Sequence, residues 1–347
     1  MTQRFLHDTL CLLTLTLLLC GVVHAAEAAK APDAGPAAAT RTPVLSLDDI
    51  WRDITAEDLD PADDPLASVN LSRSQRALKE EALLQNLYLQ QAQSYLGLIQ
   101  AGLADEAAGR QITRAQQQWE DTQTAFSTGK AFQFDVLKAQ AGILAARQAQ
   151  LKSRQQYEET LRKMVLPGDP PLLRMLPVEL ANRVEVTLDG NMDDPLAGLS
   201  TLKTLPDGLT LTALQAMDDD ALLKVAHRYR QDWALALKVK LNDQVHRAYL
   251  NLIRTIPQDI TVSRQGLETA GVYYRLAREQ EDLAQDVFNQ LQKSVQGGFS
   301  SQRELDDARY ALLQAQDSVL LSGMTWRLAA LRYLHTLGLL SPRHAQS

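Results

Sequence analysis

Apolar residues recur at alternating three- and four-residue intervals along a stretch of the chain that contains no proline. Between residues 71 and 128 the repeating positions are Ile112, Ala115, Trp119, Thr122 and Phe126. The return arm continues this spacing through Phe134, Leu137, Ala141, Leu144 and Leu151. The spacing is typical of a helix seam that faces another helix. The first half of the chain therefore predicts two long helices that pack as an antiparallel hairpin.

The second half of the chain repeats the pattern about 168 residues later. One arm carries Tyr273, Leu276, Gln280, Leu283 and Val287. The other arm carries Leu305, Ala308, Leu312, Ala315, Val319, Ser322 and Trp326. Arms of roughly 45 to 55 residues would reach about 70 to 80 Å. The repeat predicts an all-α fold of two tandem, long, antiparallel coiled-coil hairpins.

A glycine stands between the two arms of each hairpin, with a leucine eight residues after it. The pairs are Gly129 with Leu137 and Gly297 with Leu305. We expect both glycines to adopt the positive φ that reverses a helix. They could simply form turns, yet polar and aromatic residues surround them, and the tip of a long hairpin is a natural docking point. The candidate docking residues are Gly129, Lys130, Phe132, Gly297, Gly298, Phe299 and Ser300.

The last predicted helix also carries leucines outside its seam. They are Leu313, Leu320, Leu321, Leu328, Leu331 and Leu334. Apolar residues on more than one face of a helix indicate neighbours on more than one side. A monomeric bundle and a helix wall shared between subunits would both explain them, and periodicity does not choose between the two.

A proline-rich connector is expected at residues 167–215, between repeat 1 at residues 71–166 and repeat 2 at residues 216–340. Two alternating runs within the connector, residues 184–188 and 209–212, predict short strands or strand-like edges.

A helix should resume at residues 218–220, where acidic side chains favour the positive amino end of a helix. We expect it to run toward Leu252. Pro257 should kink or stop it, because proline lacks the backbone N–H that an interior helical position needs.

The amino-terminal residues have the features of an export signal. A basic residue precedes an apolar run that ends in small residues, so residues 1–25 are predicted to be a signal peptide. Both cysteines lie inside it, and the mature chain is not expected to form disulfides. Residues 26–45, rich in alanine and proline, are expected to be a disordered tether. Residues 46–70 should contain a short helical segment, and residues 341–347 a tail.

Composition and motifs argue against several functional classes. The formal net charge is -7 and no contiguous basic patch occurs, so a nucleic-acid partner is not expected. The histidines beyond the signal peptide are His227, His246, His335 and His344, and no two stand at a metal-binding interval. No nucleotide-binding or hydrolase motif is present. We therefore expect a protein that is not an enzyme and uses no metal or cofactor.

Several segments resemble the two repeats of TolC-like outer-membrane efflux proteins. They are residues 126–140, 297–308, 212–215, 229–233 and 256–257. The resemblance implies a trimer whose hairpins close into a periplasmic α-helical tunnel, associated with the outer membrane. It also implies that the tips meet a periplasmic adaptor, and that acidic side chains narrow an aperture there.

Three polar residues near the turns are candidates for that aperture, namely Asp135, Arg303 and Asp306. Asp135 lies six residues after Gly129, and the equivalent position after Gly297 is Arg303. An arginine at this position does not fit a simple cation gate.

The chain departs from the family in its strands. Family members insert a strand hairpin into each repeat to build a shared barrel in the outer membrane. Paired strands of about ten residues are not evident before Ser72 or after Pro257. We therefore expect an atypical member with little or no β-barrel.

Two functions remain from the sequence. The leading one is an exported structural conduit component, periplasmic or associated with the outer membrane, in an efflux or type I-like secretion assembly. The alternative is a soluble periplasmic coiled-coil scaffold or chaperone that binds a client without forming a channel.

Overall fold

The computed structural model describes residues 71–164, 205–238 and 243–340, together with residues 47, 50, 51, 54, 194–196, 199 and 202. All of them belong to one compact unit, Val44–Ser347. The predicted signal peptide, tether, carboxy-terminal tail and strand at residues 184–188 lie outside the described residues.

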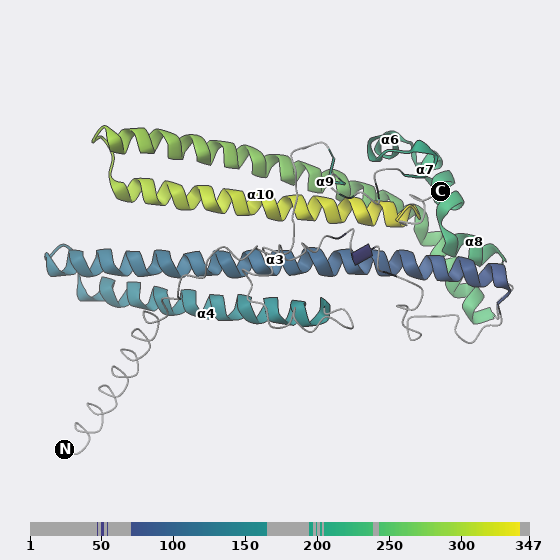
Figure 1. Ribbon diagram of the computed structural model, residues 1–347, viewed down its shortest axis with the longest axis horizontal. Coiled ribbons are helices and arrows are strands. Elements are labelled where there is room, and N and C mark those ends of the chain that lie inside the picture. The colour runs from purple at the N-terminus through teal and green to yellow at the C-terminus, as the bar shows by residue number, and fades with distance from the viewer. Residues whose placement is uncertain are drawn as a thin grey trace, which may run out of the picture. The chain divides into compact units, whose positions relative to one another are not determined.

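Every element in the described part of the chain is helical, which confirms the predicted all-α class (Figure 1). The elements in chain order are α3 (Arg73–Ser127), α4 (Gln133–Met164), η5 (Pro206–Gly208), α6 (Leu211–Ala216), α7 (Asp219–Tyr229), α8 (Gln231–Lys238), α9 (Asp243–Gln296) and α10 (Gln302–Thr336).

Two long helical hairpins form the body of this unit. Helices α3 and α4 make the first hairpin, and α9 and α10 make the second. The first arm of each has the predicted length, with 55 residues in α3 and 54 in α9. The return arms are shorter than predicted, with 32 residues in α4 and 35 in α10.

The amino end of α3 is held by a reciprocal cap. The N–H of Gln75 donates to Ser72 Oγ at 3.3 Å, and the N–H of Ser72 donates to Gln75 Oε1 at 2.8 Å. Such a capping box satisfies two backbone donors that the helix itself leaves unpaired. The long helix therefore begins at a defined residue.

The four long helices lie in the order α4, α3, α10, α9. Helix α3 contacts both α4 and α10, and α10 contacts α9 (Figure 1). Helices α4 and α9 therefore take the two outer positions. This order explains the extra leucines of α10, because that helix has a neighbour on each side.

The main hydrophobic core lies where α3 and α10 meet the short helices, away from the hairpin turns. Leu84 of α3, Leu334 of α10 and Leu222 of α7 are fully buried there. Trp51 is also buried, and its indole N–H donates to the carbonyl of Tyr88 at 3.1 Å. The core therefore attaches an amino-terminal segment to the first hairpin.

The structure corrects three local predictions. Residues 209–212 are not a strand, because the Thr210 side chain accepts from the N–H of Ala213 and caps α6. The helix that begins after Asp218 does not run on to Leu252, because α7 ends at Tyr229 and α8 at Lys238.

Pro257 does not stop its helix either. It lies inside α9, where its neighbours Ile256 and Ile260 are fully buried. Burial of these side chains offsets the hydrogen bond that proline removes, so tertiary packing overrides the local signal.

No helix in the described ranges combines the length and apolar character needed to cross a membrane.

Candidate functional site: hairpin tips and outer helix faces

The first turn follows the glycine prediction. Gly129 has a φ of 71°, in the left-handed region. Its N–H donates to the carbonyl of Phe126 at 3.0 Å, and the N–H of Lys130 donates to the carbonyl of Ala125 at 2.8 Å. These two bonds are a Schellman motif, which closes the carboxy end of α3.

The second turn has the same motif one residue later than predicted. Gly298, with a φ of 76°, is the left-handed residue, so the prediction of a positive φ for Gly297 is wrong. The N–H of Gly298 donates to the carbonyl of Val295 at 3.0 Å, and that of Phe299 to Ser294 at 2.9 Å. The leucine spacing favours the first of the two adjacent glycines. Because α9 extends to Gln296, however, Gly297 is its cap and Gly298 is the residue that reverses the chain.

The return helices begin with matching carboxylate caps. Asp135 Oδ2 accepts the N–H of Phe132 at 2.9 Å, and Glu304 Oε2 accepts the N–H of Ser301 at 2.8 Å. Hydrogen bonds from the Ser301 N–H and hydroxyl lower the pKa of the Glu304 carboxyl. The counterpart of Asp135 is therefore Glu304 and not Arg303, and both acids cap helices.

The other two aperture candidates lie together, in a groove of about 360 Å³ between α3 and α10. Arg303 and Asp306 line it, and Asp135 does not. Arg114 and Asp307 cross the groove as an ion pair of 2.9 Å. Ion pairs therefore link the two hairpins through α3 and α10, and Arg110 with Asp317 is a second such pair, farther from the turns.

The tips expose aromatic side chains. Phe132 is 79% exposed and Phe299 is 88% exposed, while Phe126 and Phe134 are also exposed. Lys130 adds an exposed charge, and Ser300 is partly buried with its hydroxyl 2.7 Å from that of Ser294. Burial of a phenylalanine side chain stabilises a contact by about 1.5 to 3 kcal/mol. The candidate docking residues thus form two small apolar surfaces beside polar groups.

The residues of the seam predicted on α4 face outward. Leu144 is 58% exposed, and Phe134, Leu137 and Leu151 are exposed as well. The positions that are instead partly or fully buried are Val136, Ala139, Ile143, Ala146, Gln150, Ser153 and Tyr157. They too follow three- and four-residue spacing, and several are small. The prediction that Phe134 to Leu151 face α3 is wrong.

Helix α9 repeats this arrangement. Leu283 is 66% exposed, and the other exposed residues of its predicted seam are Tyr273, Leu276, Gln280 and Val287. The residues that are buried instead are Leu267, Ala270, Tyr274 and Ala277. We call the exposed residues Phe134, Leu137, Leu144 and Leu151 the α4 stripe, and Tyr273, Leu276, Leu283 and Val287 the α9 stripe.

The faces that pack inward contain alanines between larger residues, whereas the exposed rows consist of large apolar residues. Two helices approach most closely where the side chains between them are small, and alanine at the contact permits a short interaxial distance. The sequence did carry this signal, as a second periodic row with an alanine at about every second position beside the leucine row. The seam predicted on α10 is largely confirmed, with Ala308, Leu312 and Val319 buried. On α3 the predicted seam is partly buried from Ile112 to Thr122, and Phe126 is exposed.

No group of three or more histidine, cysteine, aspartate or glutamate side chains in the described part of the chain could hold a metal ion.

No family model matches the chain, and no curated protein matches it by sequence. Solved structures match it by fold. CusC, whose structures are described as showing changes that accompany folding and transmembrane channel formation, is 15% identical with a TM-score of 0.50, over 82% of this chain and 87% of CusC.

Two outer membrane channels match less closely. The Campylobacter jejuni CmeC channel is 13% identical with a TM-score of 0.49, over 76% of this chain and 65% of CmeC. The Neisseria gonorrhoeae MtrE channel in its open state is 14% identical with a TM-score of 0.40, over 76% of this chain and 68% of MtrE. The matched part thus spans less than two thirds of the length of CmeC.

At these sequence identities the similarity is one of fold alone, and the comparison with CusC is the basis for it. The two tandem hairpins have the helical architecture of the TolC-like outer membrane channels.

Proposed function

We propose that this protein is a conduit component, in which copies of the chain join side by side through the α4 and α9 stripes and close as a trimer around a passage. The observation that carries this proposal is the exposure of leucines and aromatic residues on both outer helices. Periodic apolar surface of this kind on a folded chain marks an interaction site.

The position of the stripes supports a closed ring of copies. They lie on the two outer helices of the order α4, α3, α10, α9, so each copy would offer two different faces. A contact between different faces is heterologous, and repetition of it closes into a ring when the rotation permits. The TolC-like fold supports three as the number of copies.

The wider role rests on the fold. We place the protein in the periplasm, associated with the outer membrane, as part of an efflux or type I-like secretion assembly. The predicted signal peptide at residues 1–25 agrees with export. The channels that share the fold favour a role in passage over catalysis.

A cysteine cross-link would test the contact between the stripes. At about 1.5 Å per residue, Leu144 lies about 17 Å from the start of α4 and Leu283 about 20 Å from the end of α9. If the hairpin tips of neighbouring copies lie at the same height, Leu144 of one copy should contact Leu283 of the next. In a chain with Cys11→Ser and Cys20→Ser, the pair Leu144→Cys and Leu283→Cys should cross-link on oxidation into covalent trimers, as seen on denaturing gels.

The controls are the two single-cysteine variants, which should give no species beyond a dimer. Light scattering of the unoxidised protein should give the mass of three copies. A monomer that forms no cross-link would contradict the conduit and favour the scaffold or chaperone, whose client would then cover the stripes.

The tips are proposed to dock a periplasmic adaptor. A photo-reactive residue in place of Phe132 or Phe299 should cross-link to a specific envelope protein in the native cell, because both rings are exposed. The same residue at exposed Gln111, farther along α3, serves as the matched control. Equal cross-linking from Gln111 and from the tips would contradict docking at the tips.

A further inference from the structure

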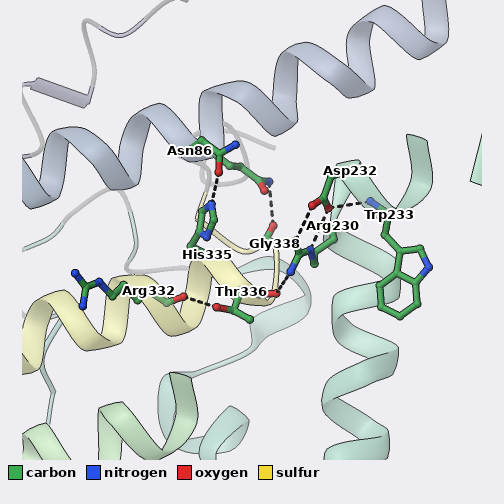
Figure 2. A network of polar contacts seen from close by, with 9 residues as sticks. Asn86, Arg230, Asp232, Trp233, Arg332, His335, Thr336 and Gly338 are labelled. Carbon is green, nitrogen blue, oxygen red and sulfur yellow. Dashed lines mark hydrogen bonds and ion pairs between the residues drawn. The ribbon is translucent and has the colours of Figure 1, made fainter. Parts of the chain in front are cut away.

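The carboxy end of α10 is joined to α3 by side-chain hydrogen bonds (Figure 2). His335 Nε2 lies 2.8 Å from Asn86 Oδ1, and Gln85 Nε2 donates to the carbonyl of Gly338 at 3.1 Å. Because an amide oxygen only accepts, the Nε2 of His335 carries the proton in this bond. The end of the second hairpin is thereby attached to the first hairpin.

A buried arginine joins the same junction from α7 and α8. Arg230 Nη1 donates to the carbonyl of Thr336 at 3.2 Å. Its Nε and Nη2 donate to the carboxylate of Asp232 at 3.0 and 2.6 Å (Figure 2). Asp232 also accepts the N–H of Trp233 at 2.8 Å. The guanidinium is therefore held in place beside the residue that follows His335.

The charged groups that act on His335 come from this arginine and its partner. Arg230 disfavours a second positive charge on the imidazole, and Asp232 favours it. From α3 the junction receives the neutral amides of Gln85 and Asn86. On α10 itself, the guanidinium of Arg332 points away from the imidazole in Figure 2.

Burial is the larger effect on this histidine, and Arg230 adds to it. Together they lower the pKa of His335 from 6.5 to about 4, despite Asp232. The carboxy end of a helix would by itself favour a cationic histidine, so burial and the guanidinium must outweigh that contribution. His335 is therefore neutral in the packed junction at neutral pH.

We propose that the junction of His335, Asn86, Arg230 and Gly338 is an acid-sensitive clasp, in which protonation of His335 near Arg230 loosens the end of α10 from α3 and from the end of α7. The clasp concerns packing within one copy, so it does not depend on the proposed conduit function. The clasp is tested by hydrogen exchange and the conduit by cross-linking and mass, so either proposal can be contradicted without the other.

The direction of the pH effect follows from the two pKa values. In a released or unfolded state the imidazole has its ordinary pKa, whereas the packed state binds the proton only near pH 4. The stabilising contribution of neutral His335 is therefore complete above pH 6.5 and declines as the pH falls toward 4. A shift of this size corresponds to a roughly 300-fold weaker affinity for the proton.

Hydrogen exchange on the full-length protein would test the clasp. After correction for intrinsic exchange rates, peptides covering residues 230–238 and 332–340 should exchange faster at about pH 5 than at about pH 7.5. The variant His335→Gln keeps a side-chain donor but cannot take up a proton, and it should lose most of this difference. His227→Gln, at an exposed histidine of α7, should retain it in the peptide covering residues 332–340, because the His227 ring packs instead on that of Trp233, with 5.2 Å between the ring centres.

Equal acid sensitivity in His335→Gln and the unaltered protein would overturn the proposal. If that variant does not fold, a nuclear magnetic resonance titration of His335 in the unaltered protein tests the clasp instead. A midpoint near 4 is expected, and a midpoint near 6.5 would overturn the clasp.

Discussion

Replacement of Gly338 by alanine is expected to destabilise the protein by roughly 3 to 5 kcal/mol, because strain and overpacking combine at this position. Gly338 has a φ of 74°, and it ends α10 in a Schellman motif. A Cβ built there would lie 2.6 Å from the N of Arg230 and 2.7 Å from the carbonyl of Tyr229. These are backbone atoms, so no side-chain rotation relieves the contact.

Gly129→Ala is the matched control for this prediction. Gly129 has nearly the same φ, at 71°, and closes the same motif, yet a Cβ there would meet nothing within 4 Å. Alanine at Gly129 should therefore cost only about 1 to 2 kcal/mol, the price of a left-handed alanine.

Chemical denaturation of both variants, followed by circular dichroism at one protein concentration, measures the difference. Similar losses for Gly338→Ala and Gly129→Ala would mean that the close approach at Gly338 does not hold in solution. The same result would also weaken the evidence that α10 packs closely against the end of α7.

Replacement of Leu144 by glutamate is expected to abolish self-association while leaving the helical content unchanged. The side chain is exposed on the single chain, so a charge there costs the folded monomer little. In the proposed contact it would be buried without a partner, which costs several kcal/mol. A loss of about 3 kcal/mol weakens a contact by more than about 100-fold.

Leu283→Glu should have the same effect from the other side of the contact. Ala149→Glu is the control, because Ala149 is exposed on α4 but lies outside the α4 stripe. Light scattering should give a monomer for the two leucine variants and the parent mass for Ala149→Glu. Parent mass in all three variants would show that the stripes do not join copies of the chain.

The sequence predicted the long helices and their hairpins well, and the reason is local. Helices α3 and α10 have no interior proline and carry serine caps, and the seam predicted on α10 is largely buried as expected. Pro257 does not stop α9 and residues 209–212 are not a strand, because burial of Ile256 and a cap at Thr210 outweigh the local signals there.

Prediction of the candidate site was less complete. The turn at Gly129 was correct, but the leucine spacing placed the second left-handed glycine at Gly297 instead of Gly298. That shift of one residue paired Asp135 with Arg303, whereas the caps pair it with Glu304. The aperture role of Asp135 follows from the family resemblance and the position after Gly129, whereas the hydrogen bond from the Phe132 N–H shows that this carboxylate caps α4.

By itself, the sequence determined that this protein consists of two helical hairpins with glycine turns, because helix periodicity and turn chemistry act over a few residues. Tertiary structure decided which side of each outer helix faces its own chain. Helices α4 and α9 each carry two periodic rows, a buried row in which alanines alternate with larger residues and an exposed row of leucines and other large apolar residues. Periodicity is the same for both rows, and only the packing of each helix against its partner places the row that contains the alanines in the interior and leaves the other row exposed.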